Sequence, residues 1–360
     1  MKITFYSTYN LQHGCGGERW LIDMANCLAN IGHSVIVLHN SKMPTHRKTE
    51  ITLDSKVEVK PLKLIGLGKF RLPLKPSDIA CVLKSSRTSN LTYLMDIGDP
   101  ITPLILALLK IRTIVGLHGG LGSLIVRSKS LSRAILAYMK FLEKIGVKFH
   151  TITATQHLRV RNYSVKKAYF SYLNIDCSFF PKKPHVEEKS FNVIWVGRRH
   201  RDKGLGFLEE VAKHMPDSVR LYIVGLNYFP VERDNIVNMG FISEREKLCQ
   251  IYSKAHILLQ TSKIETFGLV TIEALVSGLP LVATPTPLIR ELREIGFGKY
   301  ISVVDNPEKT VNSIIQYYRL WSSNVEKFLM LKNEISRKAR KIFCLSKSKV
   351  AKFLNDLCGK

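Results

Sequence analysis

The sequence lacks the cysteine patterns that hold structural metal ions. Its seven cysteines are scattered along the chain, without a C-x-x-C pair or a His/Cys cluster. This spacing gives no indication of a zinc site. Dispersed cysteines in odd number are typical of a reducing compartment, so a cytoplasmic protein with reduced thiols is expected, with thermophile-type intracellular disulfides as the alternative.

Long hydrophobic runs are also absent. The most apolar stretch, residues 101–109, ends at Lys110. It is too short to span a bilayer core of about 30 Å. The chain opens with a strand pattern from Lys2 rather than with a secretory leader, so no signal peptide is expected. Any membrane contact is therefore predicted to be peripheral.

Acidic side chains are scarce compared with basic ones. The chain has 29 Asp and Glu against 54 Lys and Arg, a formal charge of +25, and most of the excess lies in its first half. Such a field favours nucleic acid, anionic lipid or phosphate ligands, although solvated surface lysines without a partner would give the same count. A length of 360 residues suits two domains, each with its own core.

One stretch, from Glu265 to Thr284, combines a loop, a helix, a tight turn and a strand. The apolar residues after the loop recur at helical spacing. Gly278 can take the left-handed conformation that ends a helix, and Pro280 prevents its continuation. Residues 281–283 then have the composition of a buried strand.

The chemistry of this stretch suits a sugar nucleotide. A helix beginning at Phe267-Gly268 presents the N–H groups of its first turn and the positive end of its dipole to an anion such as a diphosphate. Glu273 could accept hydrogen bonds from a sugar diol, and Glu265 could do the same for a second sugar. The alternative is that both glutamates are surface residues near a helix start, where acidic side chains suit the dipole.

The pattern E-T-F-G-L-V-T-I-E-A-L-V-S-G-L-P-L-V-A-T resembles the signature of the retaining glycosyltransferases of family 4, and the resemblance covers nearly the whole chain. It implies the α/β GT-B fold, with two Rossmann-like doubly wound parallel-sheet domains facing across a cleft. It also implies transfer of a sugar from a nucleotide diphosphate sugar to a hydroxyl acceptor, such as a glycan or a lipid-linked glycan, with retention at the anomeric carbon.

Further stretches agree with the family in order. Gly197-Arg198, followed by Lys203, comes after the expected strand 191–196. Two cations there could clamp a diphosphate or could belong to a basic surface loop. In the resembled family the corresponding Arg and Lys bind the donor diphosphate. Gly225 ends the expected strand 221–224, close to where the family's base-binding loop begins.

The first half carries two glycines, Gly16 and Gly17, between the expected strand 2–7 and a helix. In the resembled family this loop lies near the donor phosphate and the acceptor. His118 ends the expected strand 113–117, where ligands bind in parallel sheets. A lone histidine is also commonly structural, whereas the family has a histidine beside the donor sugar at this place.

Domain limits follow from the same patterns. Residues 1–181 are expected to form the acceptor-side domain, with a C-terminal helix of about 340–360 packing back on it, and residues 191–339 the nucleotide-sugar domain. The polar stretch 182–190 between them is predicted to be the linker.

In the resembled family, variable loops in 41–90 contact the acceptor. A basic amphipathic helix over 123–144 could pack on the core or lie on anionic lipid.

The resemblance implies a complete set of site residues. No metal or other cofactor is expected, because no Asp-x-Asp pair stands in a metal-holding context. Two rivals remain: a sugar-nucleotide epimerase or hydrolase of the same fold, and a basic nucleic-acid-binding protein. The expected location is cytoplasmic, with contact at the inner face of the cell membrane. The expected catalytic residues are His118, Arg198, Lys203 and Glu265, and the expected donor-binding residues are Gly16, Gly17, Gly197, Arg198, Lys203, Gly225, Thr266, Phe267, Gly268, Leu269 and Glu273.

Overall fold

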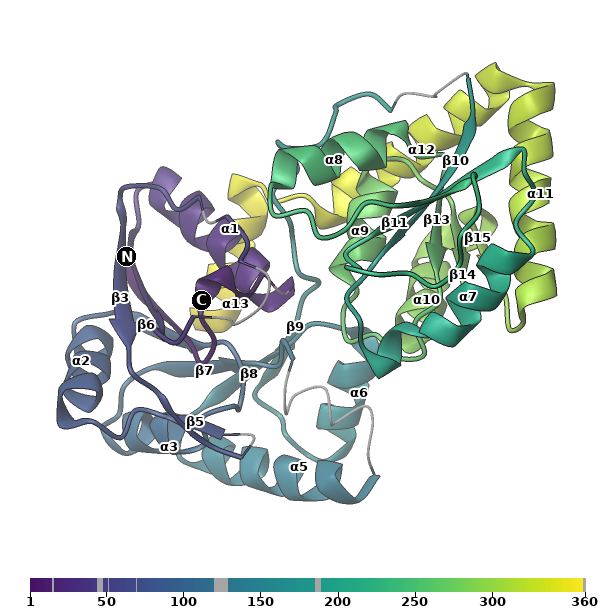
Figure 1. Ribbon diagram of the computed structural model, residues 1–360. Coiled ribbons are helices and arrows are strands. Elements are labelled where there is room, and N and C mark those ends of the chain that lie inside the picture. Colours follow the sequence, from purple (N-terminus) through teal and green to yellow (C-terminus); the bar gives the residue numbers. More distant parts are fainter. Residues whose placement is uncertain are drawn as a thin grey trace. The chain divides into compact units, whose positions relative to one another are not determined.

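A computed structural model of the chain divides into two compact units (Figure 1). Unit 1 comprises Met1–Ile175 and Leu345–Lys360, and unit 2 comprises Asp176–Cys344. Each unit is a parallel sheet with helices packed on it, so the prediction of two Rossmann-like domains is confirmed. The structure describes residues 1–14, 16–43, 48–50, 52–68, 70–119, 129–184 and 189–358, with the backbone alone for 129–131.

Unit 1 is built on a seven-stranded sheet with the order β3-β2-β1-β6-β7-β8-β9, in which every pairing is parallel. Its central strands are buried along nearly their whole length, as expected for a parallel sheet covered on both faces. The strand order reverses between β1 and β6. The strands are β1 (Lys2–Ser7), β2 (Ser34–Asn40), β3 (Val57–Leu62), β6 (Leu91–Leu94), β7 (Thr113–Gly116), β8 (Lys148–Thr151) and β9 (Ala168–Phe170).

Residues 41–90 are more regular than the sequence predicted. They were expected to be variable loops, but they contain β3, the hairpin strands β4 (Ile65–Leu67) and β5 (Phe70–Leu72), and a helix. Polar, Pro-containing strands at a sheet edge carry little periodicity, which is why they resemble loops in the sequence. The helices of unit 1 are η1 (Leu11–His13), α1 (Gly16–Asn30), α2 (Pro76–Arg87), α3 (Ile101–Leu108), α5 (Lys129–Lys144), α6 (Ala154–Asn162) and α13 (Lys347–Cys358).

Two helices of unit 1 correspond to helices expected from the sequence, the amphipathic helix over 123–144 and the C-terminal helix. The apolar side of α5, from Ile135 to Leu142, is buried in the core of the unit rather than presented to lipid. Residues 123–128 of the expected helix lie outside the described residues. The last helix, α13, buries Val350, Phe353 and Leu354 and lies beside α1 (Figure 1).

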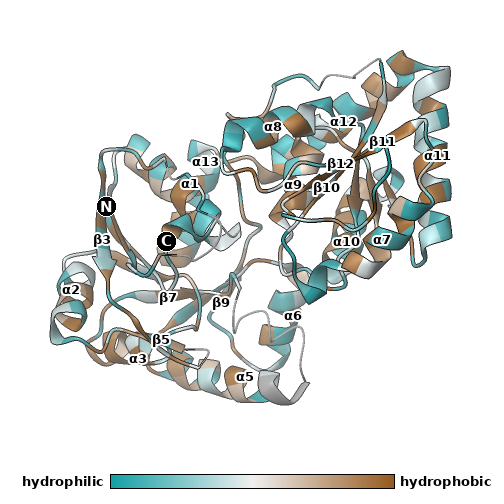
Figure 2. Cartoon of the chain, in the orientation of Figure 1, coloured by the Kyte–Doolittle hydropathy of each residue, from teal (hydrophilic) through white to brown (hydrophobic). Residues whose placement is uncertain are grey.

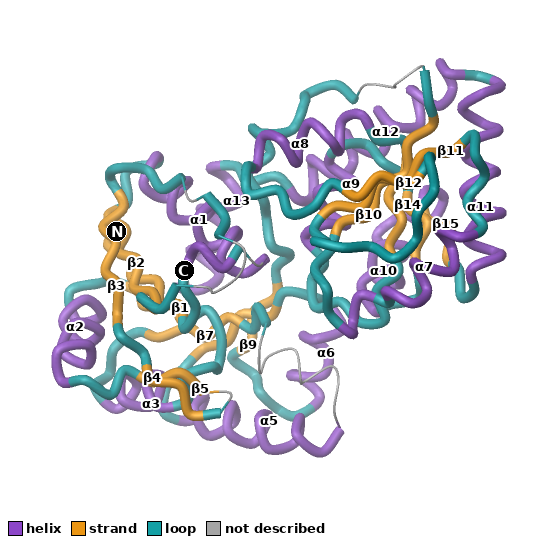
Figure 3. Tube along the Cα trace, viewed as in Figure 1, coloured by secondary structure: helices purple, strands orange, loops and turns teal. Residues whose placement is uncertain are grey.

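Unit 2 repeats the plan with a six-stranded sheet in the order β12-β11-β10-β13-β14-β15, again with every pairing parallel. Figure 2 shows these strands mostly in the colours of apolar residues, and Figure 3 shows helices flanking them. The order reverses between β10 and β13, so the loops that leave these two strands separate there. The strands are β10 (Phe191–Val196), β11 (Val219–Val224), β12 (Ile236–Asn238), β13 (Ile257–Gln260), β14 (Leu281–Ala283) and β15 (Ile301–Val303).

The helices of unit 2 bury apolar stripes against this sheet. The core gathers Phe191 and Trp195 of β10 with Leu208 of the first long helix and Phe328 of the last one. The helices are η2 (Arg201–Lys203), α7 (Leu205–Lys213), α8 (Arg245–Lys254), α9 (Leu269–Val276), α10 (Pro287–Leu292), η3 (Arg293–Phe297), η4 (Gly298–Tyr300), α11 (Pro307–Ser323) and α12 (Val325–Phe343).

The chain passes from unit 1 to unit 2 after Ile175 and returns after Cys344. The first passage therefore lies before the expected linker of 182–190, of which residues 185–188 fall outside the described residues. The reason is that 176–181 are held on unit 2: Arg340 of α12 donates to the carbonyls of Phe180 and Pro181 at 3.2 and 2.6 Å.

A disulfide joins Cys177 to Cys344. It ties together the two segments of unit 2 that lie next to the passages between the units. This bond corrects the expectation of reduced thiols for Cys177 and Cys344. It could not be predicted, because the two cysteines are 167 residues apart and cysteine spacing does not reveal disulfide connectivity. Within the described part of the chain, no helix has the length and apolar composition needed to cross a membrane.

Candidate donor site

The predicted donor-site residues of unit 2 gather at the carboxyl ends of neighbouring strands. Gly197 and Arg198 follow β10, and Gly225 follows β11. Glu265 to Leu269 follow β13 and lead into α9. Because the sheet reverses its order between β10 and β13, the loops that leave these strands lie at the position where open parallel sheets bind ligands.

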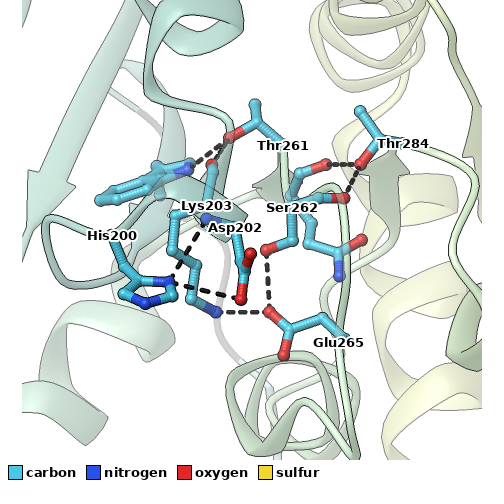
Figure 4. Close-up of polar contacts among 9 residues, drawn as sticks. His200, Asp202, Lys203, Thr261, Ser262, Glu265 and Thr284 are labelled. Carbon is cyan, nitrogen blue, oxygen red and sulfur yellow. Dashed lines mark hydrogen bonds and ion pairs between the residues drawn. The ribbon is translucent and has the colours of Figure 1, made fainter. Parts of the chain in front are cut away.

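Lys203 and Glu265, predicted separately from two distant motifs, form an ion pair (Figure 4). The Lys203 ammonium donates to Oε1 of Glu265, and the Ser262 hydroxyl donates to the same oxygen at 2.8 Å. The two charged side chains are 20% and 13% exposed. An ammonium has three N–H donors, so this pair leaves Lys203 with donors for an incoming anion.

The loops after β10 and β13 are joined by hydrogen bonds between backbone and side chains. The Trp195 indole donates to the Thr261 hydroxyl at 2.9 Å, and that hydroxyl donates to the Lys203 carbonyl at 2.8 Å. The Lys263 amide donates to the Asp202 carbonyl at 2.8 Å. These bonds hold the backbone of Lys203 against the end of β13, so the position of its side chain is fixed at both ends.

The amino end of α9 is set by a glycine. The helix begins at Leu269, two residues later than the sequence predicted, and its N-cap Gly268 has a left-handed φ of 65°. A Cβ at this position would lie 2.5 Å from Cδ2 of Leu288, which belongs to α10. In the resembled family two glycines often stand where this chain has Pro287 and Leu288. The leucine here packs against the helix terminus.

Glu273 lies within α9 and is buried, with 1% of its surface exposed. The Tyr252 hydroxyl of α8 donates to its Oε2 at 3.1 Å. The alternative of an ordinary surface glutamate is therefore wrong for Glu273. An ionised carboxylate removed from water requires such donors, and Tyr252 is one that the sequence motifs did not reveal.

Two glycines bring the ends of β10 and β11 close together. Gly225 has a φ of 98°, and a Cβ there would lie 2.3 Å from the Gly197 carbonyl oxygen. The Gly197 amide donates to the Val224 carbonyl at 2.9 Å. Gly225 therefore needs glycine for the backbone approach, and a Cβ on Gly197 would lie 2.6 Å from the Trp195 ring. Arg198, the next residue, is exposed on this loop.

In unit 1, Gly16 and Gly17 open α1, and His118 follows β7. A Cβ on Gly17 would lie 3.8 Å from Cβ of His118, so the structure brings these predicted residues together. The imidazole packs on Trp20, with ring centroids 4.4 Å apart, and its Nε2 lies 2.6 Å from the Tyr93 hydroxyl. Neither Trp20 nor Tyr93 was among the predicted site residues.

The buried imidazoles of unit 1 make stability depend on pH. Burial lowers the pKa of His118 well below its usual value, with a further lowering from His150, and burial lowers the pKa of His150 to about 4. The folded state therefore keeps both rings neutral while the unfolded chain takes up protons below its pKa of about 6.5. Stability is fully present above that pH and is lost as the pH falls towards 4.

Urea unfolding at pH 7 and at pH 5.5 tests this dependence. We expect His150 alone to lower the free energy of unfolding by about 1 kcal/mol over this interval, and His118 to act in the same direction. In His150→Gln the pH dependence should be weaker by that amount. An unchanged slope in the variant would contradict the neutral buried imidazole.

Metal ligands do not gather in the described part of the chain, where no group of three or more His, Cys, Asp or Glu side chains could hold an ion. The metal-free reaction stays a prediction. A cavity of about 600 Å³ is lined by Asp217, Arg220 and Arg233 with their neighbours. It lies beside the starts of β11 and β12, at the opposite edge of the sheet from the strand ends described above, and we do not assign it to the donor.

Comparisons with known proteins agree with this geometry. Residues 190–319 match the family described as glycosyl transferases group 1. A putative colanic acid biosynthesis glycosyl transferase of Escherichia coli is 30% identical over 86 residues, which cover 24% of this chain and 21% of that protein. The matched stretches span between about a fifth and about a third of the curated relatives' lengths.

Solved structures resemble the whole chain. Sucrose-phosphate synthase from Thermosynechococcus elongatus superposes with a TM-score of 0.73 at 14% identity, covering 99% of this chain and 98% of that one. Anabaena HepE in complex with UDP-glucose gives a TM-score of 0.70 at 15% identity, covering 99% of both. Residues 190–319 are therefore a glycosyl transferases group 1 domain, and the chain that contains them has the two-domain GT-B fold.

Proposed function

We propose that the protein transfers a sugar from a nucleotide diphosphate sugar to a hydroxyl acceptor. The observation that carries this proposal is the Lys203–Glu265 ion pair at the carboxyl ends of β10 and β13, inside a group 1 glycosyl transferase domain. Glu265 stands three residues before Gly268, the N-cap of α9. It therefore holds the Lys203 ammonium near the helix start, where a diphosphate would meet the positive end of the helix dipole.

In the proposed reaction the bond between the anomeric carbon and the β-phosphate oxygen breaks, and a bond to the acceptor oxygen forms. The acceptor's proton passes to the departing diphosphate. Negative charge develops on the β-phosphate, and we assign its stabilisation to Lys203, Arg198 and the amides of Thr266 to Leu269. These groups are part of the chain, so the step as written requires no metal.

Retention at the anomeric carbon is proposed on the family resemblance. The acceptor attacks the same face from which the diphosphate leaves, which is consistent with proton transfer to the leaving group. The acceptor is proposed to be a glycan or lipid-linked glycan. Determination of the anomeric configuration of the product by NMR tests the stereochemistry, and an inverted product would refute it.

The ribose is assigned to Glu273 and the base to the loop that begins at Gly225. We expect Glu273→Ala to weaken binding of the cognate nucleotide diphosphate by about 10- to 100-fold, because hydrogen bonds to a charged group contribute about 1.5–3 kcal/mol. Calorimetric titration with UDP and with GDP measures this loss. The matched control is Tyr252→Phe, which removes the 3.1 Å bond to Glu273 but keeps the carboxylate.

Equal affinity in wild type and Glu273→Ala would refute the proposal that Glu273 binds the ribose. If Tyr252→Phe lost as much affinity as Glu273→Ala, the effect would reflect the packing of α9 rather than contact with the nucleotide.

In unit 1, the proposal assigns Gly16, Gly17 and His118 to substrate contact. Product formation should require an added acceptor. Release of free sugar or of an epimer from the nucleotide sugar at the full rate, without an acceptor, would favour the hydrolase or epimerase alternative instead.

We also propose that unit 1 touches an anionic membrane through the β4–β5 hairpin. Leu67 pairs with Phe70 at its tip, and exposed apolar residues near cations suit the boundary between headgroups and acyl chains. Each basic residue near such a surface contributes about 1 kcal/mol. The exposed apolar side chains are Ile65, Leu67, Phe70 and Leu74, at 38–54% exposure, and the cations on the same segment are Lys63, Arg71 and Lys75.

Flotation with vesicles tests this contact. We expect wild type to float with phosphatidylcholine vesicles containing phosphatidylglycerol and to remain in the pellet with phosphatidylcholine alone. The double variant Leu67→Ser/Phe70→Ser should lose most of the bound fraction, whereas Met330→Ser, which changes an exposed apolar residue of α12, should retain it. Equal flotation of both variants would refute a role for the hairpin. The cytoplasmic location stays a prediction.

A further inference from the structure

A chain of hydrogen bonds crosses unit 1 beneath His118. It runs along the carboxyl ends of the adjacent strands β6, β7, β8 and β9. Tyr93 of β6 lies between two histidines: its hydroxyl is 2.6 Å from Nε2 of His118 and 2.6 Å from Nδ1 of His150. At the far end, Nε2 of His150 lies 2.9 Å from the Ser171 hydroxyl and 3.3 Å from the Ser171 carbonyl.

These hydrogen bonds are enclosed in the interior of unit 1. Tyr93 and His150 are both buried, and Phe353 of α13 packs edge-on against His150, with ring centroids 5.2 Å apart. Gly116, at the end of β7, makes the Tyr93–His118 contact possible. A Cβ there would lie 2.1 Å from the Tyr93 hydroxyl and 2.6 Å from Nε2 of His118.

The direction of each bond follows from what each atom can do. The Ser171 carbonyl can only accept and the Ser171 hydroxyl can also accept, so both contacts are satisfied together when Nε2 of His150 carries the proton. In the neutral ring, Nδ1 of His150 is then an acceptor and receives the single Tyr93 proton. The Tyr93 oxygen can therefore only accept from His118, which places the His118 proton on Nε2 and leaves Nδ1 as a bare lone pair.

That lone pair lacks a partner among the described residues. Nδ1 of His118 is buried and makes no hydrogen bond to any described residue. The side chain as a whole is 9% exposed. A buried polar atom without a hydrogen-bond partner is unfavourable. A bare acceptor beside the amino end of α1 suits a hydroxyl group, which can donate to it.

We propose that Tyr93 and His150 are positioning residues that fix His118 in the Nε2–H tautomer, so that its Nδ1 accepts a hydrogen bond from a hydroxyl of the substrate. This inference rests on the proposed function for the identity of the substrate. The tautomer itself is a property of the folded chain and can be measured without any reaction.

The test is a long-range ¹H–¹⁵N spectrum of wild type labelled with ¹⁵N-histidine at pH 7.5. His118→Gln identifies the His118 signals by their loss. The expected spectrum shows His118 with an imine-like Nδ1 and a pyrrole-like Nε2. A His118 ring with its proton on Nδ1 would overturn the proposal. The tautomer is read from wild type, and His118→Gln serves only to assign the signals.

Variants then test whether the hydrogen bonds from His118 through Tyr93 to His150 fix the tautomer. Tyr93→Phe keeps the ring that packs on Phe5 and Trp20 but removes both hydrogen bonds. We expect averaged His118 tautomers, and a kcat about 5-fold lower, since one lost hydrogen bond contributes about 1 kcal/mol, with KM for the nucleotide sugar unchanged. An unchanged Nε2–H signature in Tyr93→Phe would refute the claim that Tyr93 fixes the His118 tautomer.

Replacement of His150 gives the matched pair. In His150→Asn an amide oxygen can take the place of Nδ1 and accept from Tyr93, so this variant should keep the tautomer, whereas His150→Phe should lose it. Identical spectra for both would contradict the role of His150. If wild type shows the predicted tautomer but turns over no nucleotide sugar, the proposed function fails while the assignment of the tautomer is supported.

Discussion

Lys203→Ala is expected to lower kcat by about 10²–10³-fold, comparable to loss of one donor to a developing oxyanion. The variant removes the cation and also leaves Glu265 with a charge that only the Ser262 hydroxyl contacts among the bonds described above. The departing diphosphate would then meet a carboxylate in place of an ammonium. The measurement is steady-state turnover of the cognate nucleotide sugar with saturating acceptor.

The chain offers a matched control for this variant. Lys213 of α7 also pairs with a glutamate, Glu210, at 2.7 Å, but both side chains are about half exposed. Surface pairs contribute little to stability, and Lys213→Ala should retain wild-type turnover. Undiminished turnover in Lys203→Ala would remove Lys203 from the proposed stabilisation of the leaving group. A conservative Lys203→Arg change should recover only part of the rate, because a planar guanidinium places its donors differently.

Gly204→Ala is expected to lower the free energy of unfolding by about 2–5 kcal/mol, since the left-handed conformation costs roughly 1–2 kcal/mol and overpacking roughly 1–3 kcal/mol. Gly204 has a φ of 62°, and a Cβ there would lie 2.0 Å from the backbone oxygen of Thr261. Relief of this clash requires the loop after β10 to move away from β13. The same movement would separate Lys203 from Glu265, so donor binding should weaken together with stability.

Gly206→Ala is the control for that substitution. Gly206 lies in α7, and a Cβ there has no neighbouring atom within 4 Å. Alanine in a helix is favoured over glycine by about 0.5–1 kcal/mol, so this variant should be slightly more stable than wild type. Urea unfolding of both variants measures the difference. Equal stability of the two would contradict the close approach at Gly204.

Much of the candidate donor site could be predicted because it consists of short motifs at strand ends. The stretch from Glu265 to Leu269 carries its own helix start, and Gly278 and Pro280 carry its end. The pairing of Lys203 with Glu265 could not be predicted from either motif. It depends on β13 lying next to β10 although β11 and β12 come between them in the sequence.

The same reason explains what the sequence missed in unit 1. Tyr93, His150 and Ser171 come from separate strands, and only the sheet order brings them to His118. Tyr252 lies on α8 and donates a hydrogen bond to Glu273 of α9. Contacts of this kind have no local pattern, whereas the periodicity of a helix or strand is local. The Cys177–Cys344 bond is a further example.

Calorimetric titration of UDP, GDP and ADP into wild type and Lys203→Ala tests the central claim most directly, namely that the strand ends of unit 2 bind a nucleotide diphosphate through Lys203. We expect one of the three to bind wild type at a 1:1 ratio, and to bind Lys203→Ala at least about 10-fold more weakly, as for a lost charge-assisted hydrogen bond. Absence of binding by all three in wild type, or equal affinity in the variant, would contradict the account.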